Sequence, residues 1–162
     1  HGLQPIRWVG GVAVDAATLA ARPAFHPVRI RAGALGPGRP ARDLWLSQQH
    51  RVLLSGWRAE LLFGEAEVLA AARHLVNDDT ILTVHDARPL HYYHVLLDRH
   101  EIVFAEGLEA ETFLPGPQGL KSVSEPSRDE MLALFPELAR ADHPAHRPAR
   151  PLLRSWEVRL CL

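Results

Sequence analysis

Hydrophobic residues in the first two thirds of the chain come in short runs, separated by glycine, proline, asparagine or aspartate. The runs are rich in Val, Ile, Tyr, Phe and Trp, a composition and length typical of β-strands. We expect strands within residues 6–11, 26–35, 44–54, 59–64, 80–86 and 91–107. The pattern therefore predicts a mainly β fold.

Two alanine-rich segments interrupt this pattern. Residues 16–23, "AATLAARP", have helical spacing and predict a short helix. Residues 64–77 have the same spacing, but a strand over "EVLAA" followed by one helical turn fits them equally. Both alternatives stay open for the second segment.

The composition changes after Phe113. Residues 114–126 resemble a linker, and Ser127 stands three residues before Glu130, a capping-box pattern that predicts a short amphipathic helix interrupted near Pro136. The proline-rich residues 142–151 fit neither a regular helix nor a central strand, and the chain closes on a strand-like segment. We expect a β domain over residues 1–115 and an extension over 116–162, made of a linker, a short helix, a proline-rich stretch and a strand.

Composition narrows the class of protein. The chain has 162 residues, 47% of them hydrophobic, which is enough for one sizeable core. Eighteen basic and nineteen acidic residues give a net charge of -1, so we expect no nucleic-acid partner. No apolar run is long enough to span a membrane and no signal peptide opens the chain. We expect a cytoplasmic protein, or one secreted through its fusion context.

The segment "LWLSQQHRVLL" places four polar residues, 47–50, between two apolar runs. In a tight loop, the Ser47 hydroxyl and the His50 imidazole can face one point, where one polarises a carbonyl oxygen and the other reaches the neighbouring nitrogen. A plain polar turn accounts for the same residues. The motif by itself leaves both interpretations open.

A second group of candidates lies in "HYYHVLLDRHEIVF", residues 91–104. A straight strand would project His94, Asp98 and His100 to one face. Alternatively "DRHE" is a hairpin turn that brings His94 and His100 together across two strands, or a solvated turn with incidental histidines. The spacing is too long for one metal ion, so we expect no metal and no cofactor, with a His/Asp metal-dependent hydrolase as a third alternative. A single cysteine, Cys161, permits neither a disulfide framework nor a Cys-based zinc site.

Four segments carry a resemblance to a known family: "LQPIRWVGG", "HPVRIRAGALGPGRPARDLWLSQQHRVLL", "AARHLVND" and "YYHVLLDRHEIVFAEGLEAETFL". In their order and spacing, from about residue 3 to 115, they resemble the bacterial Hint (Hedgehog/intein) domains, in particular the subgroup common in alphaproteobacterial proteins. The resemblance implies a horseshoe of short strands and an autoprocessing activity, in which a cysteine attacks the preceding carbonyl in an N-to-S acyl shift and the peptide bond breaks.

The resemblance also implies roles for residues. Ser47 and His50 match the Thr and His of the family's T-x-x-H element, so His50 would protonate the leaving nitrogen and Ser47 would polarise the carbonyl. His94, Asp98 and His100 would support them. The family's nucleophilic cysteine lies ahead of the "PIRW" segment and is not among these residues, and residues 111–112 stand where inteins carry their terminal His-Asn. We therefore expect cleavage at the N-side and no true splicing.

The partner expected from this resemblance is the protein's own N-terminal segment or a fused polypeptide, as substrate. The alternative function is a catalytically inactive Hint-like binding or assembly module, whose open sheet edge holds a protein partner. Neither function calls for a nucleic acid or a membrane.

Overall fold

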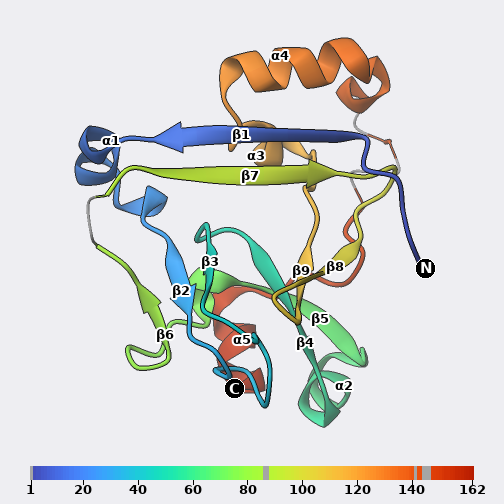
Figure 1. The fold of residues 1–162 in the computed structure, drawn as a ribbon. Coiled ribbons are helices and arrows are strands. Elements are labelled where there is room, and N and C mark those ends of the chain that lie inside the picture. The colour runs from blue at the N-terminus through green and yellow to red at the C-terminus, as the bar shows by residue number, and fades with distance from the viewer. Residues whose placement is uncertain (1, 86–87, 141, 144–146) are drawn as a thin grey trace. The chain divides into compact units, whose positions relative to one another are not determined.

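A computed structural model describes residues 2–85, 88–140, 142–143 and 147–162 (Figure 1). Over these residues it is mainly β, with nine strands in antiparallel sheets and short helices between them. The predicted fold class is confirmed.

The chain divides into two compact units, and each collects segments from distant parts of the sequence. The first unit contains residues 1–13, 90–101 and 112–149. The second contains residues 14–89, 102–111 and 150–162. The boundary expected after residue 115 falls inside the first unit.

The first unit is built on a two-stranded sheet of β1 (Trp8–Val14) and β7 (Leu90–Leu96). Three short helical segments follow: α3 (Pro117–Leu120), α4 (Glu125–Leu134) and the 3-10 helix η3 (Pro136–Ala139). The predicted interruption at Pro136 is confirmed. The predicted start is wrong by one turn, because Ser124 is the N-cap residue and its side chain accepts a hydrogen bond from the Ser127 N–H.

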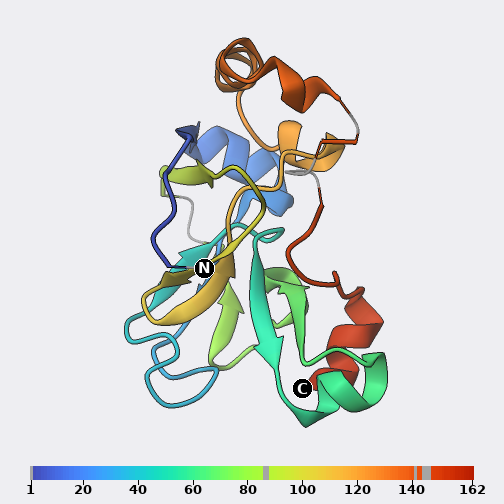
Figure 2. The ribbon, with the colours of Figure 1, turned by 90° about the vertical axis from the view of Figure 1, so that its right-hand side faces the viewer.

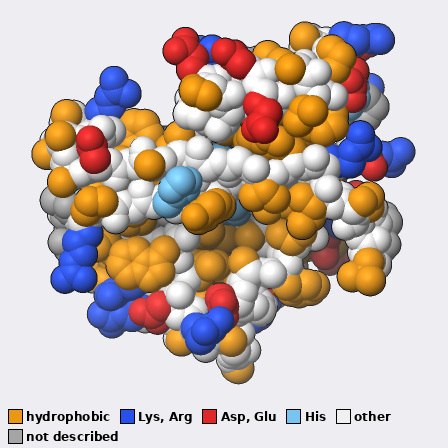
Figure 3. All heavy atoms as spheres, turned by 45° about the horizontal axis from the view of Figure 1, so that its top comes forward, with side chains coloured by type: hydrophobic (Ala, Val, Ile, Leu, Met, Phe, Trp, Pro, Cys, Tyr) orange, Lys and Arg blue, Asp and Glu red, His pale blue; other side chains and the backbone are white. Residues whose placement is uncertain are grey.

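Helix α4 packs along β1, as Figure 1 shows. The Trp8 indole N–H donates to Glu130 at 3.0 Å, and the Ser127 hydroxyl lies 3.5 Å from the carbonyl oxygen of Gly11. The face seen in Figure 3 carries charged side chains on the outer side of α4 and apolar ones beneath it. Together the helix and the strands enclose a small core: Trp8, Leu96, Phe113, Val123, Met131 and Leu138.

The second unit contains two sheets (Figure 2). One has the order β3 (Leu44–Leu46), β2 (Val28–Ile30), β6 (Ile81–Thr83). The other has the order β5 (Glu67–Ala71), β4 (Arg51–Ser55), β9 (Leu108–Glu111), β8 (Ile102–Ala105). Their inner faces share one core, whose largest fully buried members include Val28, Ile30, Val52, Val68, Leu75 and Leu108.

Five short helical segments complete this unit. They are α1 (Ala16–Ala21), η1 (Pro23–Phe25), α2 (Trp57–Phe63), η2 (Ala72–His74) and α5 (Ser155–Cys161). The predicted helix in 16–23 is confirmed, and residues 64–77 adopt the strand-then-turn alternative. No helix in the described ranges is long and apolar enough to cross a membrane.

Two strand predictions are wrong in the second unit. Residues 59–64 belong to α2, which starts after Gly56 and ends at Gly64 in the left-handed conformation, with φ of 70°. The terminal segment forms α5 instead of a strand, because the Glu157 carboxylate caps the helix by accepting from the Arg154 N–H at 2.6 Å. Only Leu152 pairs in a strand-like manner, in a parallel bridge to Leu69.

Two of the alternatives for residues 91–104 are also wrong: the hairpin turn at "DRHE" and the single straight strand that carries His94, Asp98 and His100. Strand β7 ends at Leu96 and pairs with β1, whereas β8 pairs with β9 through a two-residue turn at Glu106 and Gly107. Both turn residues have positive φ, 51° and 78°, as a type I′ hairpin requires. Asp98 and His100 therefore lie beyond the strand that carries His94, not opposite it in a hairpin.

Candidate functional site

The loop of residues 47–50 joins β3 to β4 in the second unit, and backbone hydrogen bonds within it and from η2 hold it in place. Within the loop, the His50 N–H donates to the carbonyl of Ser47 at 3.1 Å. From η2, the Ala72 N–H donates to the carbonyl of His50 at 2.9 Å, and the Arg73 N–H donates to the carbonyl of Gln48 at 3.1 Å. The backbone that carries Ser47 and His50 is thus fixed by its neighbours.

Gln48 adds a side-chain anchor to this loop. Its amide nitrogen donates to the carbonyl of Pro23 at 2.8 Å and to that of His26 at 3.2 Å. The amide therefore ties the loop to η1, so Gln48 has a structural role. The side chains of Ser47 and His50 are half-buried, and that of Gln49 is exposed. The structure places both predicted residues in one tight loop, as the sequence analysis expects.

The histidine next to this anchor has an unusual environment. His26 is buried, its ring meets the edge of the His85 ring at 4.9 Å between centroids, and its Nδ1 atom has no hydrogen-bond partner in the described residues. Sequence reasoning missed this pair, because residues 26 and 85 are remote in sequence and come together only when β2 and β6 pair.

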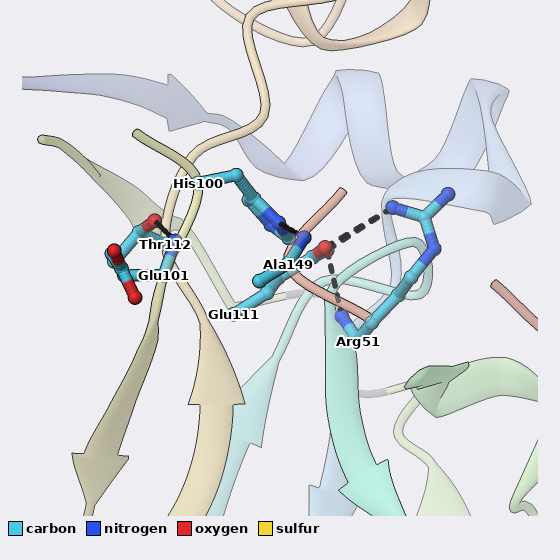
Figure 4. Close-up of polar contacts among 6 residues, drawn as sticks. All are labelled: Arg51, His100, Glu101, Glu111, Thr112 and Ala149. Atoms are coloured by element: carbon cyan, nitrogen blue, oxygen red, sulfur yellow. Dashed lines mark hydrogen bonds and ion pairs between the residues drawn. The ribbon is translucent and has the colours of Figure 1, made fainter. Parts of the chain in front are cut away.

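Arg51, the residue after His50, is held by a buried carboxylate (Figure 4). The Arg51 N–H donates to Glu111 Oε1 at 2.9 Å, and its guanidinium lies 3.2 Å from Glu111 Oε2. Glu111 is only 7% exposed. The register of β4 with β9 pairs Val52 with Ala110, which brings these two charges together. From the sequence, Glu111 stands out only as a departure from the intein pattern.

The other three predicted site residues lie in the first unit and have different neighbours. The His94 ring packs on Phe113 at 5.0 Å between centroids, and Asp98 forms an exposed ion pair with Arg7. His100 is only 3% exposed, and its Nδ1 atom accepts a hydrogen bond from the Ala149 N–H at 2.8 Å (Figure 4). These contacts give each side chain a structural task, and the predicted support of catalysis stays a prediction.

The segment around His100 is tied back by Thr112, also in the first unit. The Thr112 hydroxyl accepts from the Glu101 N–H at 3.0 Å, and the Thr112 N–H donates to the carbonyl of Glu101 at 2.9 Å (Figure 4). Beside this segment lies a polar cleft of about 420 Å³, lined by Gln4, Leu97, Asp98, Arg99 and Glu101.

Cys161 lies in α5 and packs against the core of the second unit. Burial raises the pKa of its thiol, although the nearby Arg58 charge opposes the shift. Since the thiolate is the nucleophile, this cysteine is poorly suited to attack a carbonyl. Within the described ranges, no three His, Cys, Asp or Glu side chains are grouped so as to hold a metal ion.

The fold and this loop define a class of protein: a mainly β domain with a serine and a histidine in the loop that connects β3 of one sheet to β4 of the other. Residues 1–117 match the family model described as the Hint domain. Because this match covers well over half of the chain, the protein belongs to the Hint domain family. Neither the curated proteins nor the solved structures contain a match to it.

Proposed function

We propose that residues 1–115 form an autoprocessing domain of the Hedgehog/intein type, of the bacterial subgroup that its segments resemble, and that residues 116–162 extend it. Membership in the Hint family supports this assignment. The observation that carries it is the loop between β3 and β4, where Ser47 and His50 stand on a backbone fixed by its neighbours.

The chemistry is an acyl shift within the polypeptide. A cysteine thiolate attacks the carbonyl carbon of the residue before it, the C–N bond breaks, and a thioester forms. The departing nitrogen needs a proton, which the His50 imidazolium supplies, and the Ser47 hydroxyl donates a hydrogen bond to the oxygen as negative charge develops. Water or an added thiol then cleaves the thioester.

The thiol in this scheme belongs to the polypeptide that precedes the domain, since the single cysteine of the chain, Cys161, is a poor nucleophile. The substrate is therefore the protein's own N-terminal segment or a fused polypeptide. Residues 111 and 112 are Glu and Thr, and neither supplies the Asn side chain that a splicing reaction cyclises. We propose N-side cleavage without splicing.

We assign His94, Asp98 and His100 a supporting role in the structure of the domain, away from the reacting atoms. Their contacts with Phe113, Arg7 and Ala149 hold the first unit together. Their effect on cleavage would then follow from folding and not from contact with the reacting atoms.

The test uses a polypeptide that carries the segment naturally preceding residue 1, treated with dithiothreitol or hydroxylamine. We expect cleavage at one bond, its near-complete loss in His50→Ala, and a reduced rate in Ser47→Ala that Ser47→Thr restores. His91→Ala is the matched control, because His91 is an exposed histidine that stacks on Tyr93. Equal cleavage by wild type and His50→Ala would exclude the role assigned to His50.

One observation favours the second candidate, an inactive binding or assembly module. Strand β8 is an edge of the four-stranded sheet, no described strand pairs with its outer side, and Phe104 on it is 77% exposed. The opposite edge, β5, is covered by residues 151–153 through the hydrogen bonds of Leu69. An uncovered edge of this kind accepts a strand from another chain. Absence of cleavage together with loss of partner binding on Phe104→Lys would select this candidate.

A further inference from the structure

Three arginines gather beside the loop that holds His50, all within the second unit. Arg51 pairs across the sheet with Ala71, directly before η2. The hydrogen bonds from Ala72 and Arg73 hold η2 against the loop. Helix α5, which carries Arg159, packs on η2. The three arginines thus stand on three elements that adjoin one another.

The positive charge of this neighbourhood is only partly balanced. Glu111 neutralises Arg51 at 3.2 Å. In the described residues, no carboxylate pairs with Arg73 or Arg159, and both are exposed. The only acid of α5, Glu157, caps the start of its own helix. Two exposed cations, Arg73 and Arg159, are therefore accessible to an anion from solvent.

His74 is hydrogen-bonded to Arg73, and its pKa responds to the nearby arginines. Arg73 Nε donates to His74 Nε2 at 3.0 Å, so the neutral ring carries its proton on Nδ1. That Nδ1 atom is buried and has no partner in the described residues. Burial lowers the pKa of His74, and the charges of Arg73, Arg159 and Arg51 lower it further. The three arginines therefore act on one imidazole.

We propose that Arg73 and Arg159, on the adjoining elements η2 and α5, form an oxyanion-binding site that takes a carboxylate of the polypeptide on which His50 acts. A guanidinium matches a carboxylate with two parallel hydrogen bonds, and two unpaired arginines provide both charge and orientation. An acidic side chain near the scissile bond would be held here, and the bond itself at the loop of His50. The identity of the ligand rests on the proposed function, whereas anion binding does not.

The test follows the imidazole of His74 by NMR in the 162-residue chain, at constant ionic strength. The probes are the peptide acetyl-Glu-Gly-Glu-amide, its Gln-Gly-Gln counterpart, and inorganic phosphate. We expect the acidic peptide to raise the pKa of His74 saturably, because its negative charge offsets the arginines, and the neutral peptide to leave it unchanged. Arg73→Gln and Arg159→Gln should each weaken peptide binding by about tenfold. Arg31→Gln, an exposed arginine of the same unit, is the matched control.

The outcomes separate this proposal from the proposed function. His50→Ala should still bind the acidic peptide, so loss of cleavage in that variant does not affect the anion site. No shift of His74 with the acidic peptide would overturn the proposal. So would a shift that survives in both Arg73→Gln and Arg159→Gln. A shift of the His74 pKa with phosphate but none with the acidic peptide would also overturn the proposal, because the site would then take a free phosphate.

Discussion

The loop of residues 47–50 and the segment of residues 94–100 both combine histidine with other polar side chains, yet they are held in different ways. Backbone groups of Ser47, Gln48 and His50 make the contacts that fix the loop. In the segment, the side chains themselves carry the contacts: the His94 ring, the Asp98 carboxylate and His100 Nδ1. A pattern of residue types predicts chemistry in both regions, but the loop is fixed by main-chain groups together with the Gln48 amide, whereas the segment is fixed by the candidate side chains themselves.

Among the variants that test this comparison, Glu111→Ala should cause the largest loss of stability. This change leaves the Arg51 guanidinium and N–H without their buried acceptor, so we expect the free energy of unfolding to fall by about 3 kcal/mol. Urea unfolding measures it. Glu109→Ala is the control on the same strand, because Glu109 pairs with Arg39 in a more exposed position and should cost about 1 kcal/mol or less. Equal losses would mean that Glu111 does not anchor the loop.

A smaller loss is expected from His100→Ala. The Ala149 N–H loses its acceptor and a buried ring is removed, which should lower stability by about 2 kcal/mol. His91→Ala, on the exposed side of β7, should change it little. A stable His100→Ala protein would contradict the structural task given to this histidine.

Gln48→Ala should cost about 1 kcal/mol, since two hydrogen bonds to η1 are lost from a partly exposed site. Gln49→Ala, its exposed neighbour, provides the comparison and should be neutral. Hydrogen exchange of the amides in residues 47–51 would show whether the loop loosens. Unchanged exchange would show that the backbone contacts alone hold it.

The smallest effect is a pH dependence from His74. Its pKa is lowered in the folded state, so the unfolded chain binds the proton more readily, and stability falls as pH drops from above 6.5 through the lowered pKa. His74→Gln should therefore lose less stability than wild type between pH 7.5 and pH 5 in urea unfolding. The same loss in both proteins would remove His74 as the source.

Sequence reasoning reached most of the strands, the first helix and the loop of His50, because short β-rich runs and a polar tetrad are local signals. It missed β9, since residues 108–111 lie outside every expected strand. It missed α2, since Trp57 and Arg58 were left out of the expected strand and the Gly64 cap was treated as a strand boundary. It misplaced the hairpin because Glu106-Gly107 lacks the usual Asn-Gly or Asp-Gly signal for positive φ. Arg51 with Glu111 and His26 with His85 depend on strand register, which the sequence does not display.

The most direct test of the account compares His50→Gln with His100→Gln in a polypeptide that carries the segment preceding residue 1. Thiol-induced cleavage rates and melting temperatures are measured for both, well below the melting transition. We predict that His50→Gln cleaves at least about a hundredfold more slowly with an unchanged melting temperature, because a proton donor is lost. His100→Gln should melt earlier and cleave at nearly the wild-type rate while folded. Normal cleavage by His50→Gln, with none by a folded His100→Gln, would contradict the account.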